Sequence, residues 1–402
     1  MSWLVLPTNL TDTDKVLYSA TQTRGVAGNL LPRCLASVWP NERAPIHHYM
    51  MKKLLSTLIA MLSFTTAQAQ PVNYASSYTH HSSVLNEERQ YSVYLPKEYD
   101  SQTGQHFPVL YLLDGEQHLL EVAGITDSLR GGLMPALPAM IIVAIHNTDR
   151  MRDYTPSHTQ TLPNGQPAGK AYATTGGGDK FLTYLIRELR QEIEQQFRTT
   201  RPALLVGHSL GGLLALDAFT QDNDAFQGII SIDASLWFDF PRHSEQLTQR
   251  LKQKPHFPSS LFIAIANNPY TPGFGRSEFH RDQLLKFADQ ILQASEQKQR
   301  QTAPERDITS RYYAEEDHHS VYHLAVYHGL QWLFRGYRLD LNPTTFSLER
   351  VSANYQSLNQ RFGSSLKPER NRLQALELKA RLWPQMDISV QQTQALLQHY
   401  YR

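Results

Sequence analysis

Cysteine is almost missing from this chain, since Cys34 is the single cysteine among 402 residues. One thiol excludes an internal disulfide framework and any zinc cluster built on cysteine ligands. Net charge is nearly absent too, because 38 lysines and arginines are balanced by 37 aspartates and glutamates, for a formal charge of +1. A nucleic-acid partner would call for clustered positive charge, so the composition gives it no support. With 41% hydrophobic residues, the chain can build one large domain with an appendage, or two domains.

Long apolar runs are also scarce near the start of the chain. The run at residues 54–64 is too short to cross a bilayer as an anchor. Lys52 and Lys53 precede it, and Ala67-Gln68-Ala69 follows it with the small-x-small pattern of a cleavage site. Residues 50–69 are therefore predicted to be a secretory signal peptide, cleaved before Gln70. We expect a periplasmic or secreted mature protein with no membrane anchor after cleavage.

A signal peptide should begin a protein, yet residues 1–49 precede this one. We expect translation to start at Met50 or Met51, which makes residues 1–49 a mis-assigned extension. Cys34 would then be absent from the mature protein, as suits an oxidising compartment. Mass spectrometry of the exported protein tests this expectation, and a mature N-terminus upstream of residue 50 would contradict it.

From residue 70 onward, continuous apolar runs alternate with amphipathic stretches. Runs rich in Val, Ile and Leu are typical of strands buried on both faces of a parallel sheet. The predicted strands are 91–95, 107–113, 140–145, 203–206, 228–232, 261–265 and 308–314, and the predicted helices between them are 182–197, 210–219, 279–292 and 322–334. This order predicts an α/β fold in which a mostly parallel sheet is flanked by helices. Ligands of such folds bind beyond the carboxyl ends of the strands.

The end of the chain has no strand-like run. Helical stretches are predicted at 342–362, 367–382 and 389–400, separated by Gly363 and by Trp383-Pro384. We therefore divide the chain into a hydrolase-like domain at 70–337 and a small helical appendage at 338–402. The appendage has the length of one to one and a half helix-hairpin repeats of the TPR kind, although a single unit does not make a repeat array.

A G-x-S-x-G motif lies in the middle of the chain, as Gly207-His208-Ser209-Leu210-Gly211. The predicted strand 203–206 precedes it and the predicted helix from Leu210 follows it. A nucleophile elbow requires this strand–turn–helix context, with small residues beside the sharp turn. Ser209 is therefore the predicted nucleophile.

A serine hydroxyl needs a base that takes its proton. In folds with this elbow the base histidine follows the last strand. His318 and His319 both occupy that place, in the stretch Ala314–Val321. Two adjacent side chains cannot both point at Ser209, so the pattern leaves two alternatives open.

The chain resembles the esterase D-like putative esterases of the α/β-hydrolase superfamily, and most of all the siderophore esterases, which cleave trilactone iron chelators, and their periplasmic relatives. The resemblance covers residues 75–337 and rests on YSVYLP at 91–96, VLYLLDGE at 109–116, IHNTDRMRDYTPS at 145–157, GGGDKFLTYLIREL at 176–189, VGHSLGG at 206–212, SLWFD at 235–239 and EDHHSVYHLAVYHGLQWLF at 316–334. It implies the α/β-hydrolase fold, with His318 as the base and no metal or organic cofactor. It also implies an oxyanion hole formed by the backbone N–H of Leu210 and that of Gly115 or Glu116, each typically worth about 3 kcal/mol in the transition state.

The acid of a catalytic triad is where the chain departs from the superfamily. The strand 261–265 is followed by Ala266-Asn267-Asn268-Pro269, which contains no carboxylate. Relatives among the siderophore esterases are described as Ser–His dyads, and we slightly favour a dyad here. Glu278, at a predicted helix start, is the next candidate, and Asp282 and Asp233 remain alternatives.

Three further residues are candidates for substrate binding. Arg150 and Arg152 follow a predicted strand, where a guanidinium can hold an anionic group by a forked contact. Pairing of these arginines with Asp149 and Asp153, to fix a loop, is at least as well supported. Trp237 is a candidate wall of an acyl or aryl pocket, although a large aromatic is more often part of the core.

We therefore expect a serine hydrolase that cleaves carboxylic esters of small molecules through an acyl-enzyme. Siderophore-type lactones are one substrate class, and simple acyl esters fit equally well. Two alternatives remain: an acyltransferase on the same scaffold, and a binding or scaffolding protein that works through its helical tail. The sequence does not indicate an oligomeric state.

Overall fold

The computed structural model describes residues 50–51, 53, 73–162, 166–221, 224–253, 259–268, 278–299, 308–340, 346–383, 385 and 389–402. The predicted extension at 1–49 lies outside the described residues. So does the predicted signal peptide at 50–69, apart from Met50, Met51 and Lys53. None of the helices in the described ranges combines the length and the apolar character needed to cross a bilayer.

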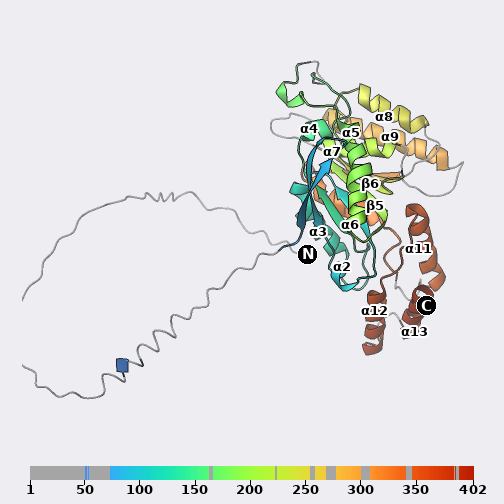
Figure 1. The fold of residues 1–402 in the computed structure, drawn as a ribbon. Coiled ribbons are helices and arrows are strands. Elements are labelled where there is room, and N and C mark those ends of the chain that lie inside the picture. Colours follow the sequence, from blue (N-terminus) through green and yellow to red (C-terminus); the bar gives the residue numbers. More distant parts are fainter. Residues whose placement is uncertain are drawn as a thin grey trace, which may run out of the picture. The chain divides into compact units, whose positions relative to one another are not determined.

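An eight-stranded sheet forms the framework of residues 71–402, which make up one compact unit (Figure 1). Its strands are β1 (Ser76–Ser82), β2 (Glu87–Tyr94), β3 (Phe107–Leu112), β4 (Ile141–Ile145), β5 (Thr199–His208), β6 (Gly228–Ile232), β7 (Ser260–Ala266) and β8 (Ile308–Tyr313). They are ordered β1-β2-β4-β3-β5-β6-β7-β8. The pairs β1·β2 and β2·β4 are antiparallel, and all later neighbours are parallel. The predicted mostly parallel α/β architecture is confirmed.

Hydrophobic residues cover both faces of the sheet. Successive side chains along a central strand belong alternately to two hydrophobic clusters, one on each face. In β3, Val109 and Tyr111 join one cluster, and Leu110 and Leu112 join the other. The first face packs against α5 (Gly178–Tyr184), the π-helical η2 (Leu185–Leu189), α6 (Arg190–Gln196), α7 (Leu210–Thr220), α8 (Arg242–Gln253) and α9 (Glu278–Gln299). The second packs against α3 (Gly115–Leu129) and α10 (Val321–Leu333). Short helices α2 (Glu98–Ser101), α4 (Arg150–Asp153) and η1 (Lys170–Tyr172) lie in the connections.

The chain ends in three helices, α11 (Leu348–Phe362), α12 (Arg370–Leu382) and α13 (Val390–Tyr401), drawn as the red group in Figure 1. Buried side chains of α11, including Tyr355 and Phe362, belong to the same cluster as the second face of the sheet. A buried ion pair also joins Glu369, which caps α12, to Arg130 at the end of α3, at 2.7 Å. The tail therefore packs against the rest of the unit. The domain boundary at residue 338 stays a prediction.

Four non-glycine residues with positive φ follow the parallel strands β3, β5, β6 and β7. They are Asp114 (53°), Ser209 (59°), Asp233 (42°) and Asn268 (50°). Such angles are uncommon for residues with a side chain, and strained positions gather at functional sites. All four lie within two residues of a strand's carboxyl end, at the edge where ligands of this fold class bind.

Candidate active site

Ser209 occupies the sharp turn between β5 and α7, with φ 59° and ψ −119°. The turn requires small neighbours. A Cβ on Gly207 would lie 2.2 Å from the carbonyl oxygen of Gly211, and one on Gly212 would lie 2.8 Å from that of Ile232. The local sequence therefore produces a nucleophile elbow, in which the hydroxyl projects from the top of the sheet.

Backbone hydrogen bonds tie this turn to the end of β6. The Ser209 N–H donates to the Ile232 oxygen at 2.9 Å, and the Ser209 oxygen accepts from the Ser235 N–H at 3.0 Å. The half-buried hydroxyl of Ser209 lies 3.1 Å from that of Ser235, and either can be the donor. The candidate nucleophile is thus held beside Asp233, which stands between Ile232 and Ser235 in the chain.

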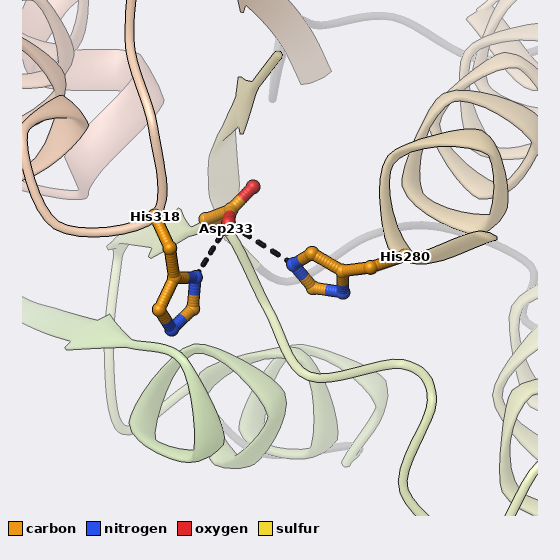
Figure 2. A group of neighbouring side chains, drawn as sticks. All are labelled: Asp233, His280 and His318. Carbon is orange, nitrogen blue, oxygen red and sulfur yellow. Dashed lines mark hydrogen bonds and ion pairs between the residues drawn. The ribbon is translucent and has the colours of Figure 1, made fainter. Parts of the chain in front are cut away.

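His318 and Asp233 form a short hydrogen bond, with 2.6 Å between Nδ1 and Oδ2 (Figure 2). Burial alone would raise the pKa of the Asp233 carboxyl, but hydrogen bonds from His280 and His318 outweigh burial and hold this pKa far below its usual range. An ionised carboxylate only accepts hydrogen bonds, so Nδ1 of His318 carries the proton. Nε2 of His318 is left with a lone pair, and in Figure 2 it points away from Asp233.

His208 anchors the His318 loop to the elbow. Its Nε2 donates to the backbone oxygen of His318 at 2.6 Å, and the two rings lie 4.5 Å apart. Burial, followed by the proximity of His318, lowers the pKa of His208 to about 3. His208 is therefore neutral near pH 7, and it fixes His318 next to the turn that carries Ser209.

Two helices begin beside the elbow. α7 starts at Leu210, and α3 starts at Gly115, with Glu116 next along the chain. The strands before them are direct neighbours, since Leu112 pairs with Val206. N–H groups in the first turn of a helix have no acceptor within the helix and are available to an anion. The predicted oxyanion donors thus lie at two adjacent helix starts, while the exposed side chain of Glu116 binds Asn147.

The carboxylate that is hydrogen-bonded to His318 belongs to Asp233. This differs from the favoured prediction of a dyad, and from Glu278 as the next candidate. Glu278 is an exposed residue at the start of α9, and the exposed Asp282 pairs with Arg281 at 2.9 Å. Asp233 is fully buried at the end of β6, one strand earlier than the usual place of the acid. The missing carboxylate after β7 is thus offset by a carboxylate from the neighbouring strand.

His280 is a residue of the site that sequence reasoning missed. It is buried on α9, and its Nε2 lies 3.0 Å from Oδ2 of Asp233. Nothing in its local sequence distinguishes it, because the contact depends on how the start of α9 packs over the end of β6. The one indication that could have suggested His280 as a site residue was its place two residues after Glu278, at a helix start predicted to face the site.

The candidate substrate-binding arginines are bound to carboxylates of the fold. Arg150 makes a forked contact with Asp114, at 2.7 and 3.0 Å. Arg152 contacts Asp153 at 2.7 Å and also Glu87. These contacts agree with the loop-fixing alternative, although the partner of Arg150 is Asp114 rather than Asp149.

Trp237, the third candidate for substrate binding, is half-buried against the first hydrophobic cluster. Its ring lies 6.3 Å from that of Phe238 in an edge-to-face arrangement. The contacts show a packing role and leave a role in the substrate pocket as a prediction.

Asp233, His280 and His318 place three potential ligand atoms within 4.8 Å of one another. A metal ion would need the lone pairs of the two ring nitrogens. Both nitrogens instead lie at hydrogen-bond distance from Oδ2 of Asp233, at 3.0 and 2.6 Å. We therefore describe the three residues as a hydrogen-bonded cluster.

Comparison with known proteins agrees with this geometry. A family model described as "Putative esterase" matches residues 82–320. The chain is similar to ferri-bacillibactin esterase BesA of Bacillus subtilis, with 30% identity over 169 residues, 39% of this chain and 57% of the relative. It is also similar to the siderophore triacetylfusarinine C esterase of Aspergillus fumigatus, with 28% identity over 151 residues, 35% of this chain and 48% of the relative. The chain thus spans about half the length of these curated relatives.

A solved structure extends the similarity across the fold. The crystal structure of an IroE-like serine hydrolase from Shewanella oneidensis is 38% identical, with a TM-score of 0.72, over 81% of this chain and 99% of the other. The family match takes in Ser209, Asp233 and His318 and more than half of the chain. On both grounds, the chain belongs to the putative esterase family and has the α/β-hydrolase fold.

Proposed function

We propose that the protein is a serine hydrolase of carboxylic esters, with Ser209 as nucleophile, His318 as base and Asp233 as the acid that orients the base. The observation that carries the proposal is the 2.6 Å contact between Asp233 and His318, held by His208 beside a strained turn that presents Ser209. The names of the similar proteins, which are esterases and a serine hydrolase, support it.

In the first half of the reaction, Oγ of Ser209 attacks the ester carbonyl carbon while Nε2 of His318 takes the hydroxyl proton. The carbonyl oxygen becomes an oxyanion between the N–H groups at the starts of α7 and α3. Collapse of this intermediate breaks the bond to the alcohol oxygen, which leaves with the proton from His318. Asp233 stabilises the imidazolium that exists between these two proton transfers.

In the second half, water attacks the acyl-enzyme and gives its proton to His318. The bond between the acyl carbon and Oγ then breaks, and Oγ recovers the proton. An alcohol in place of water would give acyl transfer, and among the described residues no contact favours an alcohol over water. The relatives named as esterases likewise favour hydrolysis over transfer or a purely scaffolding role.

Lactone esters of the siderophore type are the substrate class that we propose. The support is that two similar curated proteins are named as esterases of iron-chelating siderophores. Release of linear products from a cyclic trilactone, compared with hydrolysis of simple aryl acyl esters by the same preparation, tests this choice. Activity on the aryl esters alone would reject the lactone class and keep the esterase.

Covalent labelling with a fluorophosphonate probe tests the nucleophile. The wild-type protein is expected to take up one label, and Ser209→Ala to take up none and to lose ester hydrolysis. Ser235→Ala is the matched control, because its hydroxyl lies 3.1 Å from that of Ser209 but does not sit on the elbow. Labelling that persists in Ser209→Ala and disappears in Ser235→Ala would contradict the assignment.

A further inference from the structure

Two histidines from different elements converge on one oxygen of Asp233 (Figure 2). His318 approaches from the loop after β8, and His280 from the first turn of α9. Their ring nitrogens lie 2.6 and 3.0 Å from Oδ2. The proposed mechanism uses His318 as the base and leaves His280 without a role.

We propose that His280 is a positioning residue that draws on the charge of Asp233 and thereby sets the pH at which His318 becomes an active base. The inference rests on the proposed function, since it concerns the proton acceptor of that reaction. A hydrogen-bond donor to a carboxylate disperses its negative charge. Less of that charge then stabilises the imidazolium form of His318, so the base releases its proton at lower pH.

The carboxylate of Asp233 is held in place without His280. The Ala266 N–H donates to Oδ1 at 2.9 Å, and the side-chain amide of Asn268 donates to Oδ2 at 3.0 Å. Both donors come from the end of β7, not from α9. Loss of the His280 donor should therefore increase the negative charge that the Asp233 carboxylate presents to His318, while the carboxylate itself stays in position.

The ionisation states at the cluster agree with this role. Hydrogen bonds from His280 and His318 keep the pKa of Asp233 far below its usual range despite burial. Asp233 is then an anion throughout the pH range in which a histidine can act as a general base. Because an anionic carboxylate only accepts, Nε2 of His280 must be its protonated nitrogen.

Other titratable groups face the cluster from each neighbouring element. His208 lies at the end of β5, with its ring 4.5 Å from that of His318. His319 and Asp317 belong to the His318 loop, and Asp114, after β3, acts on His208 from a longer distance. The lowered pKa of His208 keeps that residue neutral above about pH 3, so His208 adds no charge beside His318 near pH 7.

The pH dependence of kcat/KM for a chromogenic ester tests the proposal with the full-length protein. In His280→Phe the acid limb of the profile is expected to shift to higher pH by about half a unit, because Asp233 then stabilises protonated His318 more strongly. The plateau at high pH should fall by less than tenfold. The Nδ1 proton of His318 should also move further downfield in the NMR spectrum, as its hydrogen bond strengthens.

Two variants separate this role from simple packing. His280→Gln retains an amide donor in place of Nε2 and should return the acid limb to the wild-type position. His243→Phe is the matched control, since His243 is another buried histidine, 3.2 Å from the carboxylate of Asp217 and outside the site. It should leave the profile in place even if the melting temperature falls.

An acid limb that stays in place in His280→Phe would overturn the proposal, as would an equal shift in His280→Phe and His280→Gln. Failure of the proposed function would look different. In that case the wild-type protein would show no Ser209-dependent hydrolysis or labelling at any pH.

Discussion

Asp233 combines a strained backbone with a fully buried charge, in a single residue at the end of β6. Four donors surround its carboxylate: the backbone of Ala266 and the side chains of Asn268, His280 and His318. Such a set offsets the cost of burying an ion, which is otherwise several kcal/mol. The same set holds the Asp233 carboxylate in position to accept the hydrogen bond from His318.

Replacement of Asp233 by Asn should lower kcat for ester hydrolysis by about 10³–10⁴-fold, because an amide can donate to His318 and stabilise the wrong tautomer. Steady-state kinetics on a chromogenic ester measures this loss. Glu278→Gln is the control and is expected to stay within about twofold of wild type, since Asp233 holds the position on His318. A large loss of activity in Glu278→Gln together with full activity in Asp233→Asn would show that Glu278 of α9, and not Asp233, is the acid of the triad.

Ser209 could be predicted as the nucleophile from the sequence because a strand, a turn and a following helix carry local signals. The same pattern left His318 and His319 open as the base, and only the family resemblance favoured His318. The acid could not be predicted, since three carboxylates at 233, 278 and 282 all fit the order of elements. Contact with His318 depends on which strand end the loop after β8 crosses, and that is a property of tertiary packing. His280 escaped prediction for the same reason.

At the scale of elements, buried parallel strands were predictable and polar elements were not. The apolar runs that become β3 to β8 all lie where the strand pattern predicts. β1 (SSYTHHS) has no apolar run, because it is an edge strand paired on one side only. α8 was not predicted because its sequence is mostly polar, although its buried residues His243, Leu247 and Leu251 recur every four positions.

The turn between β5 and α7 requires glycine at position 207, because neighbouring backbone atoms leave no room for a side chain there. A methyl group on Gly207 would meet backbone atoms of Gly211 at 2.2 and 2.4 Å, and backbone cannot move aside as a flexible side chain can. Gly207→Ala is therefore expected to lower the free energy of unfolding by about 3 kcal/mol, measured by urea denaturation.

Gly124 provides the matched control for this substitution. It lies in α3, where an added methyl group would meet no atom within 4 Å beyond the helix's own backbone. Gly124→Ala should therefore leave stability unchanged or raise it by up to about 1 kcal/mol. Equal destabilisation by the two substitutions would show that the elbow is not sterically special.

At the scale of the molecule, the helical tail is tied to the hydrolase core by a buried charge network. Arg130 at the end of α3 contacts Glu369 of the tail at 2.7 Å and Glu98 of α2 at 2.5 Å. Tyr355 of α11 adds a hydrogen bond to the backbone of Tyr337, at 2.7 Å. The three tail helices lie where the sequence predicts helices, but these long-range contacts follow from no local pattern.

Glu369→Ala should cost about 3 kcal/mol of stability, because it leaves the buried Arg130 with one carboxylate instead of two. The surface pair Glu377–Arg381 supplies the comparison, and Glu377→Ala is expected to cost less than about 1 kcal/mol. Urea denaturation of both variants measures the difference. If Glu369→Ala were as mild as Glu377→Ala, the tail would not be held by this network.

The positive φ angles after β3, β5, β6 and β7 have a consequence for engineering. Glycine adopts such angles freely, whereas a residue with a side chain pays on the order of 1 kcal/mol for each. Glycine at Asp114, Asp233 or Asn268 would relieve this strain, but it would also remove a buried hydrogen-bond partner of Arg150, His318 or Asp233, at a cost of about 1–3 kcal/mol for each group left unpaired. A directed-evolution campaign that selected for heat resistance alone should therefore retain all three side chains, and with them the strained backbone.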